Sequence, residues 1–229
     1  MMTMNNAPIT HYPDLLQVSE EWIAARCGML TASEARHIIT PKMLPAKNEK
    51  MRAHAYELLS QRITKYVDPR YVSDDMLRGQ DDEIDARELY SKRYAPVQEM
   101  GFIVRNFGEF LIGYSPDGLV GDDGTIEVKS RRAKLQIETI TNGSMPAEHM
   151  VQVQTGLLVS DRKWCDYLSY SAGLPMAVYR IAADPAMHDA IIAAAAAFET
   201  FIDDIEMMYL AESLRFLPTR RRVEQEMVI

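Results

Sequence analysis

The order of helix-like and strand-like segments constrains the fold of this chain more than any other feature of its sequence. From hydrophobic spacing and turn signals, the predicted helices span 19–26, 33–39, 47–66, 73–94, 132–141, 147–160 and 185–213. The predicted strands span 97–106, 109–114, 125–130, 163–171 and 176–182. A strand meander followed by a helical crossover and further strands indicates an α/β fold, with a central mixed β-sheet flanked by helices.

The chain is long enough for one domain with a sizeable core. It has 229 residues, of which 47% are hydrophobic, and it shows no internal repeat and no linker-like stretch. We therefore expect a single domain spanning residues 1–229. The longest apolar run, 190–198, is too short to cross a bilayer. The first residues do not resemble a signal peptide and there are only two cysteines, so we expect a cytoplasmic protein.

Charge is unevenly distributed along this acidic chain. The formal net charge of -8 argues mildly against nucleic acid as a partner, because phosphates need local positive charge. Basic residues nevertheless cluster at Arg131, Arg132 and Lys134, and again at Arg220–Arg222. An acidic protein can carry a basic groove, so the first cluster is compatible with phosphate binding. We interpret the second cluster as a solvated surface.

Two carboxylates and a lysine carry the clearest chemical signal. Asp117 follows a proline in a turn, and Glu127 and Lys129 lie two residues apart in a predicted strand. Residues at this spacing share one face of a strand, which leaves Ile126 and Val128 for the core. Two carboxylates repel each other unless a cation lies between them, and Mg²⁺ prefers such oxygen ligands. We expect two Mg²⁺ ions, replaceable by Mn²⁺, with the metal ligands Asp117, Glu127 and Val128.

This combination suits the hydrolysis of a phosphodiester, for which a metal activates water and screens the phosphate. Lys129 either takes a proton from the attacking water or stabilises the charge that grows on the phosphate, and the sequence leaves both roles open. Each half of the pattern is ordinary by itself, since Ser-Pro-Asp-Gly is a common turn and Glu-Val-Lys a common strand. At this spacing, the pair resembles the signature of the PD-(D/E)xK nuclease superfamily.

Four blocks in a fixed order extend the resemblance to a narrower family. They are 22–34, 78–87, the Ser-Pro-Asp-Gly and Glu-Val-Lys pair within 115–129, and 149–154. Over about 19–160 the chain resembles the family of phage lambda exonuclease and the viral alkaline exonucleases. This resemblance implies a PD-(D/E)xK core of the restriction-endonuclease type, in agreement with the predicted α/β class.

The resemblance implies further catalytic residues on two of the predicted helices. Glu83 matches a glutamate that completes the acidic site, although locally it is equally typical of an i,i+4 pair with Arg87. Gln152 matches a glutamine that positions the nucleophilic water or the scissile phosphate. His149 shares a helix face with Gln152 and is expected to contact DNA. The family pattern has tyrosine at His149, so the sequence does not define the nature of that contact.

A further group, Arg26, Thr31 and Ser33, lies in the first block. In the family, the matching arginine and serine bind the phosphate at the 5′ end of DNA. The sequence Thr-Ala-Ser-Glu at 31–34 is also a capping box, which predicts that a helix begins here. The two interpretations are compatible, because a helix start presents free N–H groups to an anion. Arg26 would add a bidentate contact to the phosphate.

Met76 and Leu77 precede Glu83 at the start of the predicted 73–94 helix. Hydrophobic residues at this position fit a wedge that separates the strands at a duplex end. They equally fit the protein core, which is the more common place for such residues.

The resemblance also implies a substrate, an oligomeric state, a partner and a cellular location. We expect a Mg²⁺-dependent 5′→3′ exonuclease that digests linear double-stranded DNA with 5′-phosphate ends to 5′ mononucleotides and leaves a 3′ single strand. The family implies a homotrimeric ring around DNA and a single-strand annealing protein as partner in recombination. It further implies a phage or prophage gene that acts in the bacterial cytoplasm. No GxxxxGK[ST] sequence occurs, which argues against movement driven by ATP.

Two alternatives stay open on sequence grounds. Another PD-(D/E)xK nuclease, such as a restriction-like endonuclease, would use the same residues and would cut closed circular DNA. Its iron–sulfur relatives need four cysteines, which the two present here exclude. A non-enzymatic module that binds DNA ends would not hydrolyse them, and the presence of Asp117, Glu127 and Lys129 argues against such a module.

Overall fold

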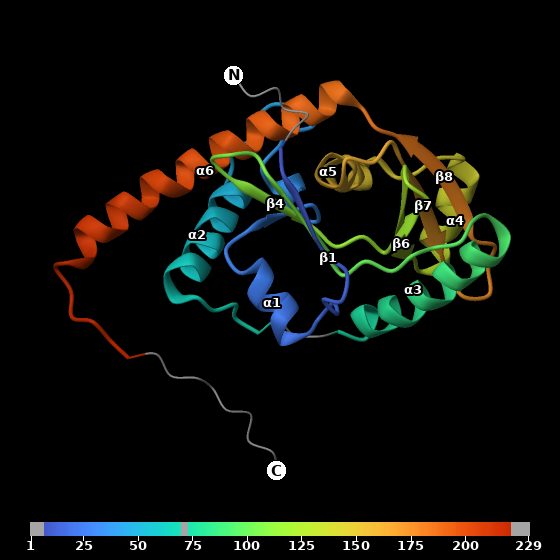
Figure 1. The fold of residues 1–229 in the computed structure, drawn as a ribbon, viewed down its shortest axis with the longest axis horizontal. Coiled ribbons are helices and arrows are strands. Elements are labelled where there is room, and N and C mark those ends of the chain that lie inside the picture. The colour runs from blue at the N-terminus through green and yellow to red at the C-terminus, as the bar shows by residue number, and fades with distance from the viewer. Residues whose placement is uncertain (1–6, 70–72, 221–229) are drawn as a thin grey trace, which may run out of the picture.

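The computed structural model describes residues 7–69 and 73–220 and confirms the α/β class (Figure 1). The helices are α1 (Glu20–Arg26), α2 (Glu49–Thr64), α3 (Asp74–Arg93), α4 (Ala133–Asn142), α5 (Met150–Ser160) and α6 (Pro185–Ser213). Two 3₁₀ helices are η2 (Ala35–His37) and η3 (Ala147–His149). The strands are β1 (Ile9–Tyr12), β2 (Leu30–Thr31), β3 (Phe102–Asn106), β4 (Leu111–Tyr114), β5 (Gly118–Val120), β6 (Gly124–Ser130), β7 (Trp164–Tyr170) and β8 (Ala177–Ala182).

The strands divide into two four-stranded mixed sheets, where the sequence suggested one. The first sheet has the order β1-β3-β4-β2, and its β2–β4 pair is parallel. The second has the order β5-β6-β7-β8, and its β6–β7 pair is parallel. A parallel pair needs a long connection, which α4 and α5 supply between β6 and β7. An isolated bridge between Gln98 and Leu119 attaches the segment before β3 to the second sheet.

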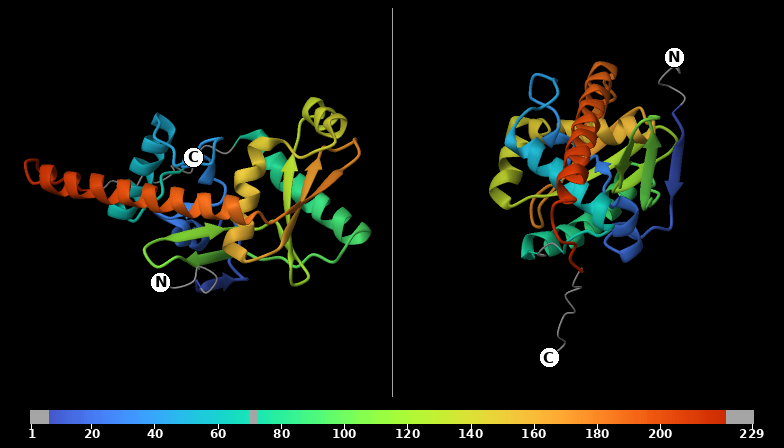
Figure 2. Two further views of the ribbon diagram at one scale, coloured as in Figure 1. Left: turned by 90° about the horizontal axis from the view of Figure 1, so that it is seen from above. Right: turned by 90° about the vertical axis from the view of Figure 1, so that its left-hand side faces the viewer.

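Side-chain caps determine where the three longest helices begin. Asn48 caps α2, Ser73 caps α3 and Asp184 caps α6, and each accepts a hydrogen bond from a backbone N–H group of the first turn. Pro185 suits the first position of α6, because this position needs no N–H donor, and the predicted range of this helix is confirmed. The C-terminal part of α6 extends beyond the other elements (Figure 2). No described helix combines the length and apolar character needed to span a membrane.

Helix α5 lies between the two sheets and contacts both (Figure 1). Its residues Val153 and Leu157 are buried against Tyr167 of β7. Gly156 allows the helix to approach β4 closely, because an added Cβ would lie 2.7 Å from the Tyr114 ring. This packing orients the start of α5, and therefore Gln152 and His149, toward β6.

Helix α3 covers the second sheet. Ala86 and Tyr90 are buried against Ile126 and Val128 of β6, as expected for the core-facing side of that strand. The Tyr90 hydroxyl donates to the buried Asp166 carboxylate of β7 at 2.6 Å. This contact fixes α3, and with it Glu83, relative to the sheet.

Three predicted features differ from the structure. The strand predicted at 97–106 begins only at Phe102, because the preceding residues bridge to the other sheet through Gln98. The helix predicted at 33–39 is reduced to the three residues of η2. Strands β1, β2 and β5 were not predicted, since each is only two to four residues long and pairs with distant segments.

Candidate active site

Strand β6 brings Glu127 and Lys129 together on one face, as the spacing predicted. Glu127 is only 2% exposed, and its Oε1 accepts a hydrogen bond from Lys129 Nζ at 2.6 Å. On the opposite face of the strand, Ile126 and Val128 pack into the core. Glu127 is therefore buried beside a partly buried Lys129, and this burial strengthens the electrostatic interaction between the two groups.

Asp117 lies in the loop between β4 and β5, directly beside β6. Its Oδ2 accepts a hydrogen bond from the backbone N–H of Val128 at 2.6 Å. Arg87 of α3 donates to the Asp117 carbonyl at 3.0 Å and so holds the backbone of the loop. The two carboxylates and the lysine that the sequence predicted to converge thus occupy one place in the fold.

Glu83 of α3 faces the same carboxylates. Its Oε1 lies 3.5 Å from Arg87 Nη1, which is the i,i+4 pair considered from the sequence. Burial raises the pKa of Glu83, and although Arg87 opposes this effect, the nearby Glu127 carboxylate adds to it. Glu83 therefore pairs with Arg87 and also belongs to the acidic cluster.

The electrostatics of the cluster reflect its burial and its excess of negative charge. Burial, Glu127 and Glu83 raise the pKa of Asp117 well above its usual range. Burial alone would lower the pKa of Lys129, but the carboxylates of Glu127 and Asp117 outweigh this and raise it. Lys129 is consequently held in its charged form, while the carboxylates repel one another.

A divalent cation fits this cluster. The Oε2 atom of Glu127 is buried and has no hydrogen-bond partner within the described part of the chain. This unpaired oxygen lies beside a second carboxylate whose pKa is raised by burial and by repulsion. A hard cation would bind the free oxygen and neutralise the repulsion between the two carboxylates. Asp117 and Glu127 offer the oxygens, and the third predicted ligand, Val128, adjoins Glu127 and donates its N–H to Asp117.

Helix α5 and η3 contribute two more predicted residues. Gln152 Nε2 donates to Glu127 Oε1 at 2.5 Å, which places the glutamine at the acidic cluster. The His149 ring stacks on Tyr167, with ring centroids 5.5 Å apart, and its Nε2 lies 3.3 Å from Arg131 Nη1. Burial and then Lys129 lower the pKa of His149 to about 4, so this imidazole is neutral at neutral pH and accepts from Arg131.

Replacing Asp117 by asparagine should stabilise the metal-free protein. Because the pKa of Asp117 is raised on folding, its stabilising contribution is present below the ordinary value of 3.8 and is lost as the pH rises through the raised value. Asparagine removes the repulsion with Glu127 and Glu83 and keeps an oxygen for the Val128 N–H. At neutral pH in EDTA we expect Tm to rise by about 2–4 °C, equivalent to roughly 1 kcal/mol. Calorimetry over a pH series measures this, and an unchanged or lower Tm would contradict the repulsion.

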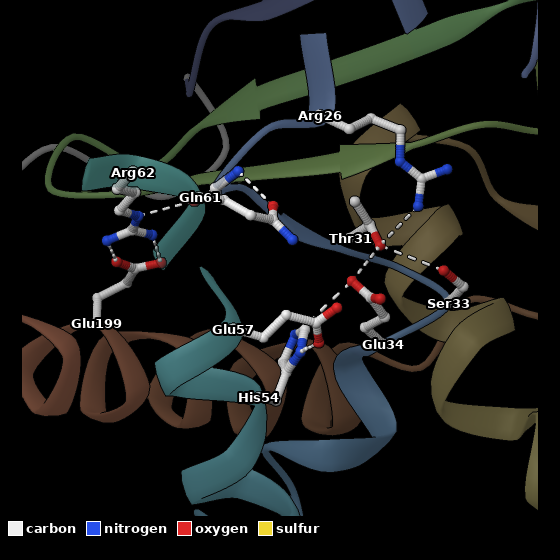
Figure 3. Close-up of polar contacts among 10 residues, drawn as sticks. Arg26, Thr31, Ser33, Glu34, His54, Glu57, Gln61, Arg62 and Glu199 are labelled. Carbon is white, nitrogen blue, oxygen red and sulfur yellow. Dashed lines mark hydrogen bonds and ion pairs between the residues drawn. The ribbon is translucent and has the colours of Figure 1, made fainter. Parts of the chain in front are cut away.

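The three residues assigned to the 5′ phosphate lie side by side (Figure 3). Arg26 Nη2 donates to Thr31 Oγ1 at 3.3 Å, and Thr31 Oγ1 lies 3.2 Å from Ser33 Oγ. The Arg26 guanidinium also lies over the Trp22 ring, 3.9 Å from its centroid. Trp22 Nε1 in turn donates to Ser115 Oγ at 2.9 Å. The indole therefore connects this group to the loop that carries Asp117.

The capping-box prediction at 31–34 is wrong. Thr31 belongs to β2, where it pairs with Gly113 of β4, and the following η2 has no side-chain cap in the described structure. Glu34 Oε2 accepts from the Thr31 hydroxyl at 3.2 Å instead of binding a backbone N–H of a helix start. Phosphate binding at this place would thus depend on side chains and not on a helix terminus.

Contacts with α2 and α6 hold the turn between Arg26 and Thr31 (Figure 3). Gly28 has a positive φ of 72°, and an added Cβ would lie 2.5 Å from Arg62 Cγ. The Gly28 N–H donates to Gln61 Oε1 at 2.8 Å, and its carbonyl accepts from Arg62 Nε at 2.7 Å. Arg62 also forms a two-bond ion pair with Glu199 of α6, at 2.7 and 2.9 Å.

Met76 lies on the surface, in the first turn of α3. Its side chain is 52% exposed and that of Leu77 is 51% exposed, so neither belongs to the core. Arg132 pairs with Asp75 at 2.7 Å, which attaches this turn to the segment that follows β6.

The two basic clusters are placed differently. Arg131 lies near the active site through His149 and also contacts Glu148 at 3.4 Å, whereas Lys134 is exposed on α4. In the C-terminal cluster, Arg220 is exposed, and residues 221 and 222 lie outside the described residues.

Sequence reasoning missed the positioning roles of two arginines. It treated Arg87 only as a partner for Glu83, whereas the structure shows that Arg87 also holds the Asp117 carbonyl. It treated Arg131 only as part of a basic cluster, whereas Arg131 contacts His149 beside Lys129. Arg87 does lie in the second family block, at 78–87, and this was the available signal.

The sequence was compared with known protein families. Residues 21–163 match the YqaJ-like viral recombinase domain, which is more than half of the chain. The chain belongs to the YqaJ-like viral recombinase family. Every candidate site residue from Arg26 to Gln152 lies within the matched range. A search of curated proteins found no match to this family member.

Solved structures resemble the chain over most of its length. The alkaline exonuclease LHK-Exo from Laribacter hongkongensis is 32% identical, with a TM-score of 0.71, over 84% of this chain and 99% of that one. For LHK-Exo in complex with dAMP, the identity is 32%, the TM-score is 0.75 and the coverage is 86% and 100%. A phage-related exonuclease from Haemophilus somnus 129PT, 14% identical, shares the fold with a TM-score of 0.60, over 79% and 96% of the chains. The predicted resemblance to the viral alkaline exonucleases is therefore confirmed.

Proposed function

We propose that this member of the YqaJ-like viral recombinase family is a Mg²⁺-dependent exonuclease acting on linear double-stranded DNA. It would digest the strand with a 5′ phosphate in the 5′→3′ direction, release 5′ mononucleotides and leave a 3′ single strand. The observation that carries the proposal is the convergence of Asp117, Glu127 and Lys129 at β6. The family match and the 32% identity to an alkaline exonuclease support it.

Each residue of the cluster has a distinct part in the proposed hydrolysis. Mg²⁺, when bound, supplies activation of water and neutralisation of phosphate charge, and we propose two such ions, replaceable by Mn²⁺. Asp117 and Glu127, with Val128 beside them, hold the metal, and Glu83 completes the acidic cluster. Gln152 holds the Glu127 carboxylate through its amide and can turn the same group toward water or phosphate.

Lys129 acts in this proposal as a fixed positive charge beside the scissile phosphate. Its pKa is raised by Glu127 and Asp117 despite burial, which favours the ammonium form over a proton acceptor. A positioned cation stabilises the negative charge that develops on phosphate oxygens in the transition state.

DNA contacts are proposed for three regions around this centre. Arg26, Thr31 and Ser33 would bind the 5′ phosphate, because the guanidinium and two hydroxyls converge there. His149 would contact the DNA near Lys129 as a neutral ring. Met76 would meet the duplex end, since it is exposed at the start of the helix that carries Glu83.

The proposal is tested with linear duplex DNA labelled separately at its two 5′ ends and its two 3′ ends. With Mg²⁺ we expect mononucleotides from the 5′-labelled ends first, intact 3′ labels, and no cutting of closed circular DNA. Cutting of circular DNA would indicate an endonuclease, and binding without hydrolysis would indicate a DNA-end-binding module. Either result would overturn the proposal, as would release of 3′ labels first.

Replacing Arg26 by alanine should remove the preference for 5′-phosphorylated ends. A charged hydrogen-bonding group contributes about 1.5–3 kcal/mol, so the ratio of initial rates on phosphorylated and hydroxyl ends should fall by about tenfold or more. Matched hairpin substrates that differ only in the 5′ phosphate measure the ratio. Arg93→Ala, an exposed arginine in the last turn of α3, is the control and should keep it. An unchanged ratio in the Arg26 variant would remove Arg26 from the phosphate site.

We also propose a homotrimeric ring that encloses DNA, acting with a single-strand annealing protein in phage-type recombination. An exposed apolar surface at the end of α6 and just beyond supports an assembly, since monomers rarely leave such surfaces uncovered. It consists of Met207, Met208, Tyr209, Leu210, Leu214, Phe216 and Leu217. Light scattering of the purified chain tests the trimer directly.

A further inference from the structure

A second cluster of metal-ligating side chains lies away from Asp117 and Glu127. Glu34 precedes η2, and His54 and Glu57 come from α2 (Figure 3). One ligand atom from each of the three residues lies within 4.8 Å of the other two. None of these residues has a part in the proposed nuclease chemistry.

The imidazole of His54 is buried and held in one orientation. Its side chain is only 4% exposed, and its ring stacks on Phe198 of α6 with centroids 5.6 Å apart. Its Nδ1 lies 3.2 Å from Glu57 Oε2, a hydrogen bond that fixes the ring and assigns the proton to Nδ1 when the imidazole is neutral. The lone pair of Nε2 then points away from Glu57.

The Nε2 atom is buried without a hydrogen-bond partner among residues 7–69 and 73–220. Glu34 Oε2 lies 3.7 Å from it, which is too long for a hydrogen bond. Two ligand atoms that each lie about 2.1 Å from a tetrahedral zinc ion are about 3.4 Å apart. The separation of these two atoms is therefore close to the one that a shared ion requires.

We propose that Glu34 and His54 bind a first-row transition-metal ion such as Zn²⁺, with Glu57 orienting the His54 ring. A nitrogen ligand beside a carboxylate favours such an ion over Mg²⁺, which prefers oxygen ligands alone. The hydrogen bond from Nδ1 to Glu57 is the contact that orients metal-binding histidines and raises their basicity. Glu57 therefore positions the imidazole, and Glu34 and the Nε2 atom of His54 are the two groups that face the ion.

The site opens into a pocket of about 570 Å³ that leaves room for the remaining ligands of the ion. Its wall includes Ser33 and the basic residues Arg26, Arg36 and Lys50. Water or an anionic group in this pocket would complete the coordination. The alternative is that no ion binds and that His54 only contacts the two carboxylates directly, and the experiment separates the two cases.

The experiment uses the full-length chain carrying Asp117→Asn and Glu127→Gln, which removes the other metal site. Apo protein is titrated with Co²⁺ as a spectroscopic probe, and Zn²⁺ is then added in competition. We expect one Co²⁺ per chain with visible d–d absorption, displaced by Zn²⁺. Metal binding is read without DNA, so the result does not depend on the proposed nuclease activity.

Single replacements on this background locate the site. Glu34→Gln and Glu57→Gln should each weaken Co²⁺ binding by at least about tenfold. Glu49→Gln, at the exposed start of the same helix, is the matched control and should bind as the parent does. Because His54 is buried, its replacement endangers folding, so the carboxylate variants carry the test, with thermal melts to show that they are folded. Absence of bound Co²⁺, or equal affinity in all three variants, would overturn the proposal and leave only the direct contacts of His54 with the two carboxylates.

Discussion

Replacing Asp117 by asparagine, or Glu127 by glutamine, should lower Mg²⁺-dependent hydrolysis of linear duplex DNA by at least about a thousandfold. A bound metal contributes several kcal/mol to such reactions, and a thousandfold loss corresponds to about 4 kcal/mol. Each replacement removes one charged ligand and keeps an oxygen for the existing hydrogen bonds from Val128 and Gln152. The loss would therefore reflect metal binding and not a disturbed fold.

Two comparisons make this prediction specific. Asp122→Asn changes an exposed aspartate in the turn between β5 and β6 and should leave the rate unchanged. The Asp117 variant should lose activity while the metal-free protein melts at a higher temperature, because the same repulsion that the metal relieves is removed. Single-turnover release of labelled nucleotides measures the rate. Substantial Mg²⁺-dependent hydrolysis by either active-site variant would rule out the proposed metal site.

The elements that were predicted well are those whose signals are local. The terminal helix begins after its own cap, Asp184, and at Pro185, and its predicted range of 185–213 is the observed one. The alternation in 125–130 identified β6 and separated Glu127 and Lys129 from the core-facing Ile126. In both segments, the information lies within a few residues of the feature that it specifies.

The elements that were missed depend on partners that are distant in the chain. Strand β1 is mostly exposed and exists through its pairing with β3, ninety or more residues later. Thr31 was interpreted as a helix cap, yet its backbone pairs with Gly113 in β4. Local propensity favoured a helix at 33–39, and this long-range pairing overrode it.

In the candidate site too, the features with local sequence signals were predicted and the long-range contacts were not. The convergence of Asp117, Glu127 and Lys129 was predicted from spacing together with the family resemblance, and the geometry agrees with it. The contact from Arg87 to the Asp117 carbonyl was not predicted, because it depends on how α3 packs against the second sheet. The grouping of Glu34 with the His54 side chain was likewise hidden, because twenty residues and a turn separate them in sequence.

Replacing Lys129 by alanine should reduce hydrolysis by about a hundred- to a thousandfold while leaving DNA binding nearly unchanged. Loss of one positioned group that stabilises transition-state charge has this magnitude. DNA affinity rests on many contacts over a larger surface, so one buried ammonium group contributes little to it. Lys92→Ala, an exposed lysine on α3, is the matched control. Single-turnover rates and equilibrium binding with Ca²⁺ separate the two effects, and hydrolysis by the Lys129 variant at the normal rate would refute a catalytic role.

Arginine at position 129 separates the two chemical roles that the sequence left open for this lysine. An arginine keeps the positive charge but cannot give up its proton, so it can stabilise phosphate charge and cannot act as a base. Because Glu127 and Asp117 raise the pKa of Lys129, we expect the ammonium form to be the active one. Lys129→Arg should then recover part of the activity lost in Lys129→Ala, with no new decline at low pH. If Lys129→Arg is as inactive as Lys129→Ala although it is folded and binds metal, proton transfer by Lys129 becomes the better explanation.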